Sequence, residues 1–222
     1  TELALDDVPQ ESLTARRLRE VLRAGDRARD LVRQILTFSR QVPRSKSLVN
    51  ISAVIRETLS FLRSTLPTTI EIRSEIKDEH IMACADPTQI KQVLINLGSN
   101  AGFAMREHGG TLEVIESSID LNKEEAEKVA PGLAPGPYIQ VAVRDTGYGM
   151  DEETLGHIFE PFFTTKKGEG TGMGLAVAHG IVEDHQGAIT VQSRPGQGTA
   201  FFVYLPGTDD GCPEESTREQ SA

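Results

Sequence analysis

The sequence predicts a fold of the α/β class, in which helices and strands mix, preceded by a long helix. Residues 70–76 alternate apolar and polar side chains, as expected for a strand with one buried face. Residues 87–107 instead place apolar side chains at helical spacing. Residues 10–41 keep a helical spacing over a greater length. The chain therefore divides into a helical segment and a mixed α and β domain that follows it.

The composition is that of an ordinary globular protein. Its 222 residues, 38% hydrophobic and 25% charged, suffice for one large domain or two smaller ones with a real core. The formal net charge of -10 argues against nucleic acid and anionic membranes as general partners, since both select positive surfaces. No apolar run approaches the ~18 residues of a membrane helix, and the first residues do not form a signal peptide.

The two cysteines, Cys84 and Cys212, lie far apart in unlike contexts. We therefore expect no disulfide framework and a reducing, cytoplasmic location. The chain starts at Thr1 and not at a methionine, which indicates a piece of a longer protein. Any membrane attachment would then come from upstream segments.

Residues 10–41 have the apolar pattern of a coiled coil or helical bundle. Apolar side chains recur at alternating steps of three and four, at Val21, Ala24, Ala28, Leu31, Ile35 and Phe38. A helix with such a seam needs a partner to bury it, although an ordinary helix packed on its own domain also explains the pattern. Pro43 ends the helix, and residues 41–47 form a short polar linker.

The mixed domain spans residues 47–206. Asp86 and Pro87 have the pattern of a helix N-cap followed by proline at the first helical position. A Glu/Lys-rich segment at 122–128 is expected to be an exposed excursion, and the tail 207–222 to be disordered. Residues 146–172 are expected to be rich in loops. The expected strands are 47–51, 70–76, 81–85, 111–118, 137–145, 188–193 and 199–205, and the expected helices are 52–64, 87–107 and 173–185.

The helix 87–107 contains the first candidate site. Asn96 and Asn100 are four residues apart and therefore lie on one face, at the edge of the buried stripe. Asparagine is a mediocre helix former, whereas its amide oxygen is a suitable ligand for magnesium. The pair fits a metal site, and it equally fits plain hydrogen bonding to neighbouring backbone.

Asp145 follows an expected strand and begins the segment Asp-Thr-Gly-Tyr-Gly-Met. A carboxylate held at a strand end is able to accept a hydrogen bond from an exocyclic amine. Gly147 and Gly149 let the backbone approach a flat ring. The alternative is an aspartate-led turn.

A glycine-rich segment leads directly into the helix 173–185. It contains Gly168, Gly170, Gly172 and Gly174, which together predict a mobile loop. The first turn of the helix exposes N–H groups that suit an anion, and Lys166 and Lys167 just before the loop suit terminal phosphates. The pattern is neither a P-loop nor a dinucleotide fingerprint.

Three phenylalanines precede this loop. Phe159, Phe162 and Phe163 lie within five residues of a chain that has eight phenylalanines in all. We expect them to pack into the core and to anchor the loop.

The order of these four segments resembles the N, G1, F and G2 boxes of sensor histidine kinases, whose ATP-binding fold is shared with gyrase, MutL and heat-shock chaperones. The resemblance covers about residues 47–206. It implies a two-layer α+β sandwich: a mixed, mainly antiparallel sheet with about three helices on one face, preceded by a helical-hairpin remnant. Further agreement comes from residues 86–87, 185–187 and 196–199.

The resemblance also assigns residues to roles. Asn100 matches the magnesium ligand, and Asn96 matches a residue that contacts the ion, its water or phosphate. Asp145 matches the adenine-binding aspartate, supported by Thr199, Gly147 and Gly149. The phosphate-side lid corresponds to Gly170, Thr171, Gly172, Met173, Gly174 and Leu175. The ATPases of this superfamily carry glutamate where this chain has Asn96, and asparagine is unable to act as that base, which favours phosphotransfer over hydrolysis.

Residues 1–42 resemble part of a kinase dimerisation domain, with residues 27–40 as its second helix and residues 1–5 as the end of its first. The family's phosphoacceptor is a histidine followed by an acidic residue. None of His80, His108, His157, His179 and His185 has that neighbour. We therefore expect the acceptor histidine to lie upstream of this chain.

The resemblance implies transfer of the γ-phosphate of ATP to a histidine and then to the receiver domain of a response regulator. It implies ATP and Mg²⁺ as cofactors, a homodimer in the intact protein, and no nucleic acid. Two alternatives stay open: an anti-sigma-type serine kinase and a non-catalytic nucleotide-binding module. The long helix argues against the first, and the intact Asn100, Asp145 and glycine lid argue against the second.

Overall fold

The computed structural model describes residues 8–9, 12–19, 21–22, 25, 46–77, 82–166, 170–208 and 212. All structural statements below refer to these residues.

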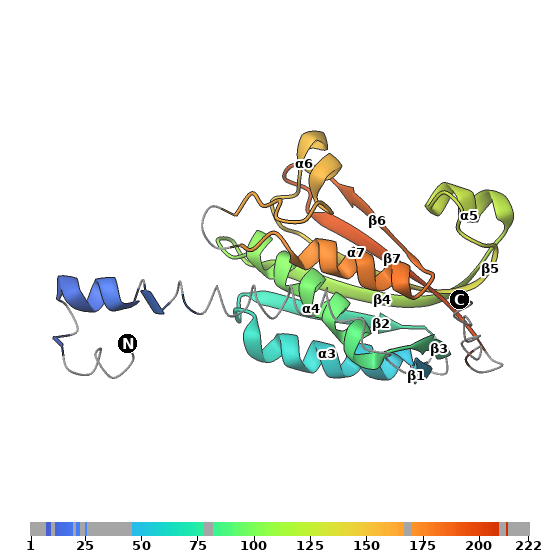
Figure 1. Cartoon of the computed structure of the whole chain (residues 1–222), viewed down its shortest axis with the longest axis horizontal. Coiled ribbons are helices and arrows are strands. Elements are labelled where there is room, and N and C mark those ends of the chain that lie inside the picture. Colours follow the sequence, from blue (N-terminus) through green and yellow to red (C-terminus); the bar gives the residue numbers. More distant parts are fainter. Residues whose placement is uncertain are drawn as a thin grey trace, which may run out of the picture.

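A five-stranded sheet in the order β2-β4-β5-β7-β6 forms one layer of the domain (Figure 1). Strand β2 (Ile70–Ile76) runs parallel to β4 (Gly110–Leu121). The remaining neighbours pair antiparallel: β4 with β5 (Gly136–Asp145), β5 with β7 (Thr199–Pro206), and β7 with β6 (Ala188–Ser193). The prediction of a mixed, mainly antiparallel sheet is confirmed.

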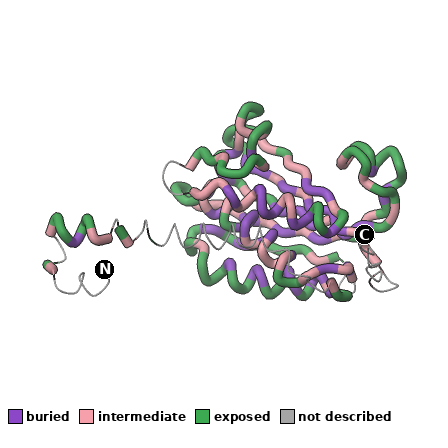
Figure 2. The backbone as a smooth tube through the Cα atoms, in the orientation of Figure 1, coloured by how far each residue is buried: buried purple, intermediate pink, exposed green. Residues whose placement is uncertain are grey.

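Three helices form the second layer, α3 (Ile51–Thr65), α4 (Pro87–Ala104) and α7 (Gly174–Asp184), and they cover one face of the sheet (Figure 1). Helix α4 lies between the other two and contacts both. Their inward faces and the facing residues of the sheet are buried together (Figure 2). Burial of this apolar surface is what holds the two layers together.

Two glycines let α3 and α4 pack closely. A side chain at Gly98 would place its Cβ 2.6 Å from Leu62 Cδ1, and one at Gly102 would collide with Leu66. Glycine inside a helix costs about 1 kcal/mol relative to alanine, and here the close helix contact offsets that cost. Helix α4 begins where predicted, because the Asp86 carboxylate accepts from the backbone N–H of Thr88 at 2.8 Å.

Two short helices were missed by the sequence reading. Helix α5 (Lys123–Val129) lies in the segment expected to be an exposed excursion, and α6 (Glu152–His157) lies in the region expected to be rich in loops. Each has at most one buried residue, so neither shows an apolar stripe. The signal that was available is the capping box of α5, in which Asn122 and Glu125 satisfy each other's backbone N–H groups.

Strands β1 (Ser47–Asn50) and β3 (Met82–Ala85) pair antiparallel as a separate ribbon. Gly207 extends this ribbon by an isolated bridge to Ala83. Cys212 forms a disulfide with Cys84 of β3. The expectation that these cysteines stay unpaired is wrong. Their separation of 128 residues gave no hint of contact, because the ribbon that brings them together forms only in the folded domain.

The predicted long helix lies largely outside the described residues. Residues 13–19, 21–22 and 25 are helical. Val21, the first residue of the predicted seam, is 57% exposed. Several features of the sequence analysis lie outside the described residues: the remaining seam residues, residues 1–5, His80 and the tail beyond 212. In the part of the chain that the structure describes, no helix combines the length and the apolar character needed to cross a membrane.

His185 joins two of the helices. It follows α7, and its ring Nδ1 donates to the carbonyl oxygen of Ile181 at 2.7 Å. Its Nε2 accepts from the backbone N–H of Asp86, the N-cap of α4, at 3.1 Å. Both contacts require a neutral ring with its proton on Nδ1. Burial lowers the pKa of His185, and the positive charge of Lys46 acts in the same direction, while the hydrogen bond to Ile181 and nearby acidic groups oppose this.

We expect the free energy of unfolding to fall as the pH drops below about 6.5, the ordinary pKa of histidine. The unfolded chain then takes up a proton at His185 that the folded protein does not bind, because the folded pKa is lowered. Urea unfolding at about pH 7.5 and about pH 5.5 measures this loss. The loss should be smaller in His185→Gln, whereas the exposed His108→Gln should retain it. Equal pH dependence in all three proteins would contradict the assignment.

Candidate functional site

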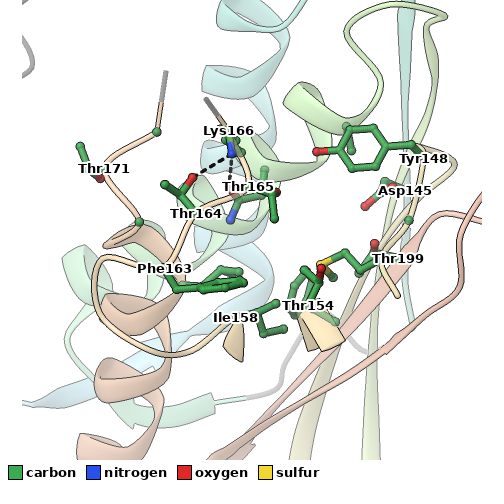
Figure 3. Close-up of a pocket in the computed structure, with 18 residues that line it drawn as sticks. Asp145, Tyr148, Thr154, Ile158, Phe163, Thr164, Thr165, Lys166, Thr171 and Thr199 are labelled. Carbon is green, nitrogen blue, oxygen red and sulfur yellow. Dashed lines mark hydrogen bonds between the residues drawn. The ribbon is translucent and has the colours of Figure 1, made fainter. Parts of the chain in front are cut away.

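A cavity of about 340 Å³ opens between α4, the ends of β5 and β7, and the loop that joins α6 to α7 (Figure 3). Most of the residues predicted for the site line it. They are Asn100, Asp145, Gly149, Lys166, Gly170, Thr171, Gly172, Leu175 and Thr199. Four predicted residues with described positions, Asn96, Gly147, Met173 and Gly174, are not among the lining residues. Lys167 lies outside the described residues.

Asp145 ends β5, directly opposite Thr199 in the antiparallel pair β5–β7. Its Oδ1 accepts from the backbone N–H of Gly147 at 2.8 Å. Burial raises the pKa of Asp145, and the N–H groups of Gly147 and Thr199 oppose that rise. The side chain points into the cavity (Figure 3). The result is a fixed, partly desolvated hydrogen-bond acceptor on one side of the cavity.

The two glycines after Asp145 have structural roles. A Cβ at Gly147 would lie 2.5 Å from that of Ala104, so this glycine lets the loop touch α4. Gly149 has φ 68° and its backbone lies against the carbonyl of Arg194, where any side chain would collide. Both glycines hold the Asp145 loop between α4 and the turn before β7.

The other side of the cavity has a positive charge. The Lys166 ammonium donates to Asn100 Oδ1 at 2.6 Å and lies 4.5 Å from the centroid of the Phe103 ring. Burial lowers the pKa of Lys166. An amide oxygen that accepts a hydrogen bond from a cation is also a suitable ligand for a metal ion in its place.

Asn96 is buried and engaged with protein groups. Its Nδ2 donates to the carbonyl oxygen of Gly174 at 2.8 Å, and its Oδ1 accepts from Gln92 Nε2 at 2.9 Å. It therefore fixes the first residue of α7 against α4. The sequence left two roles open for Asn96, hydrogen bonding to backbone and binding of a metal. The structure shows a hydrogen bond to backbone.

A hydrogen bond joins the two ends of the loop between α6 and α7. Phe162 donates its backbone N–H to the carbonyl oxygen of Gly172 at 3.0 Å, and Gly172 has φ 67°. Met173, at the start of α7, is buried. No side chain among the described residues caps α7, which is compatible with an anion at the N–H groups of its first turn. That anion site stays a prediction.

Phe159 and Phe163 pack against the core as expected. The expectation for Phe162 is wrong, because this side chain is 62% exposed. Its φ of 70° is rare for a residue with a side chain and turns the ring outward. Sequence spacing alone gave no sign of this reversal.

Tyr148 is a site residue that the sequence reading missed. It lines the cavity and its ring extends over it (Figure 3). Partial burial and the nearby Asp145 carboxylate raise its pKa. Its place between the two glycines was the available signal, since a residue fixed there has to lie near whatever Asp145 binds.

The described residues fit magnesium only together with a phosphate ligand. They contain no group of three or more His, Cys, Asp and Glu side chains that could hold a metal ion alone. Asn100 supplies one hard oxygen, and the ammonium beside it shows that a cation fits there. A magnesium ion would therefore arrive already bound to a nucleotide's phosphates.

Comparisons with known proteins identify the family of this domain. A profile of the family described as "Histidine kinase-, DNA gyrase B-, and HSP90-like ATPase" matches residues 85–209, and the chain belongs to this family. The catalytic domain of histidine kinase ThkA is 32% identical, with a TM-score of 0.59 over 73% of this chain and 96% of that domain. The mixed domain is thus a histidine-kinase-type ATP-binding domain.

Longer relatives are also similar. Sensor kinase CckA of Brucella abortus is 35% identical over 183 residues, 82% of this chain and 19% of that protein. ThkA in complex with response regulator protein TrrA has a TM-score of 0.68 and 26% identity, over 91% of this chain and 54% of that one. The chain therefore spans about a fifth of the length of CckA.

Proposed function

We propose that this chain is the catalytic region of a sensor histidine kinase. Residues 47–206 bind ATP and transfer its γ-phosphate to a histidine outside this chain. The supporting observation is one cavity that has an acceptor carboxylate, Asp145, on one side and the Lys166 ammonium on the other (Figure 3). That ammonium donates to the amide oxygen of Asn100, which also lines the cavity. That arrangement suits an adenine ring and a metal-bound phosphate chain.

Each side of the cavity has its own task. Asp145 accepts from the adenine amine, and Gly149 lets the ring approach the backbone. Asn100 is a ligand for Mg²⁺, which when bound neutralises charge on the phosphates. Lys166, and Lys167 after it, donate to the terminal phosphates, and the N–H groups of the first turn of α7 face the phosphate chain. Catalysis is then positioning and charge neutralisation.

The described residues favour phosphotransfer over hydrolysis. Asp145 is the single carboxylate among the described lining residues, and it lies on the opposite side of the cavity from Lys166 (Figure 3), whose ammonium donates to Asn100. The Asn96 amide is occupied by Gln92 and Gly174. Among the described residues, no second carboxylate lines the cavity to activate water, and we infer that the acceptor enters from another domain.

The partners follow from this role. Residues 1–42 belong to a helical hairpin that forms a homodimer in the intact protein. The phosphorylated histidine then serves a response regulator, as the ThkA complex with TrrA suggests. We place the domain in the cytoplasm, where ATP is available, with any membrane attachment through upstream segments. The Cys84–Cys212 disulfide argues for a less reducing compartment, and ATP use outweighs it.

Labelling with γ-labelled ATP tests the proposal, because phosphohistidine survives base and is lost in acid. The 222-residue chain should bind Mg·ATP and take up no base-stable label, since none of its histidines is followed by an acidic residue. The same chain extended upstream through its acceptor histidine should take up that label, and extended Asn100→Ala should not.

Other outcomes identify the alternatives. Acid-stable, base-labile label on a partner would indicate the serine kinase. ATP binding without label in either chain would indicate the non-catalytic module. Base-stable label on the 222-residue chain would show an acceptor within it.

A further inference from the structure

Tyr148 places an aromatic hydroxyl over the cavity of the candidate site. The side chain is 51% exposed, and its ring lines the cavity (Figure 3). Within the described part of the chain, no residue donates to this hydroxyl or accepts from it. By contrast, the hydroxyl of Tyr138, outside the cavity, donates to the carbonyl oxygen of Ala134 at 2.8 Å. The Tyr148 hydroxyl is therefore able to bind a group that enters the cavity.

The backbone around Tyr148 is fixed by hydrogen bonds on both sides of the residue. The carbonyl oxygen of Tyr148 accepts from the N–H of Gly196 at 2.7 Å. The N–H of Met150 donates to Ser193 Oγ at 2.8 Å. Both bonds join the Tyr148 segment to the end of β6 and the turn between β6 and β7. A side chain that extends from a fixed backbone loses little conformational entropy when it binds a ligand.

The hydroxyl lies between the two sides of the cavity. Figure 3 shows Tyr148 on the same side as Asp145, with its hydroxyl pointing toward the side where Lys166 lies. In the proposed complex the adenine amine lies at Asp145 and the terminal phosphates lie at Lys166. The ribose and the α-phosphate join these two parts of ATP, so the hydroxyl faces that middle part of the nucleotide.

The chemistry of this hydroxyl suits a sugar better than a phosphate. Partial burial and the Asp145 carboxylate raise the pKa of Tyr148, so the group keeps its proton at neutral pH. A neutral phenol both donates and accepts a hydrogen bond, as the hydroxyls of a ribose do. The negative charge of Asp145 repels a phosphate near this hydroxyl and has no such effect on a neutral sugar.

We propose that Tyr148 is a specificity-determining residue that binds a hydroxyl of the ribose and makes the site prefer ATP over its deoxyribose analogues. This proposal rests on the proposed function, because it takes the adenine to lie at Asp145 and the terminal phosphates at Lys166. Tyr148 selects the sugar and takes no part in phosphate transfer. Because the side chain is half exposed, water replaces part of the lost hydrogen bond, and the preference should be about two- to tenfold.

One protein change combined with one ligand change tests this contact. Tyr148→Phe removes the hydroxyl and keeps the ring, whereas 2′-deoxy-ATP and 3′-deoxy-ATP each lack one ribose hydroxyl. Titration calorimetry with Mg²⁺ measures the affinity of the wild-type chain and the variant for ATP and both analogues. The wild-type chain should bind ATP about two- to tenfold more tightly than at least one analogue. In Tyr148→Phe this preference should disappear, because the two missing groups are partners in one hydrogen bond.

A matched variant and a stability measurement serve as controls. Tyr204→Phe removes a tyrosine hydroxyl outside the cavity, in the apolar cluster that β7 forms with α5, and it should keep both the ATP affinity and the sugar preference. Tyr148→Phe should unfold in urea at the same concentration as the wild-type chain, since its hydroxyl has no partner among the described residues.

Two results would overturn the role of Tyr148. One is a wild-type chain that binds ATP and both analogues equally well. The other is a sugar preference that Tyr148→Phe retains; an equal loss of affinity for all three nucleotides in this variant would indicate contact with the α-phosphate instead.

Failure of the proposed function gives a different result. A wild-type chain that binds no Mg·ATP would overturn the proposed function and the role of Tyr148 with it. A wild-type chain that binds Mg·ATP, and loses affinity when Asp145 is replaced by asparagine, but shows no sugar preference would overturn the role of Tyr148 alone.

Discussion

Replacing Asp145 by asparagine should weaken ATP binding by about 5-fold to about 150-fold, the equivalent of about 1–3 kcal/mol for a mismatched buried polar pair. The backbone N–H groups of Gly147 and Thr199 both point at this side chain. They will bind the amide oxygen of an introduced asparagine and turn its NH₂ group toward the cavity. A donor then faces the adenine amine, which is also a donor.

Titration calorimetry with Mg·ATP measures the effect. Asp151→Asn is the matched control, since Asp151 caps the exposed helix α6 through the Thr154 N–H and asparagine caps nearly as well. The control should bind ATP like the wild-type protein. Unchanged affinity in Asp145→Asn would show that adenine does not bind at this side of the cavity.

Gly198→Ala should destabilise the domain far more than Gly196→Ala. Both glycines have positive φ, 79° and 74°, so alanine at either position costs about 1–2 kcal/mol in backbone conformation. A Cβ at Gly196 meets nothing within 4 Å, whereas one at Gly198 would collide with the carbonyl oxygen of Asp145. Relieving that clash should cost about 1–3 kcal/mol more.

The clash between a Cβ at position 198 and the Asp145 carbonyl oxygen should also disturb the candidate ATP site. Moving the Asp145 carbonyl shifts the end of β5 and with it the carboxylate in the cavity. Gly198→Ala should therefore lose ATP affinity as well as stability. Gly196→Ala should keep its ATP affinity and lose only the stability that its positive φ costs an alanine. Urea unfolding and calorimetry on both variants give the comparison. Equal stability of the two would contradict the contact between Gly198 and Asp145.

The sequence was sufficient for most elements of the mixed domain. Strand β2 and strand β6 have the predicted limits, and α4 begins at the predicted cap. Each of these has a local signal: alternation on a half-buried strand, or an aspartate before proline. The short helices α5 and α6 bury almost no residues, so their sequences show no apolar pattern that would predict a helix.

The candidate site also has parts that the sequence predicted and parts that appeared only in the structure. The sequence identified Asp145 and Asn100 because each stands at a place fixed by its own element, a strand end and a helix face, and the lid because its glycines lie close together in the chain. The disulfide between Cys84 and Cys212, the outward turn of Phe162 and the contact of Lys166 with Asn100 appeared only in the folded structure. The physical reason is range: periodicity and capping depend on neighbours within a few residues, whereas these contacts join segments that only sheet and helix packing bring together.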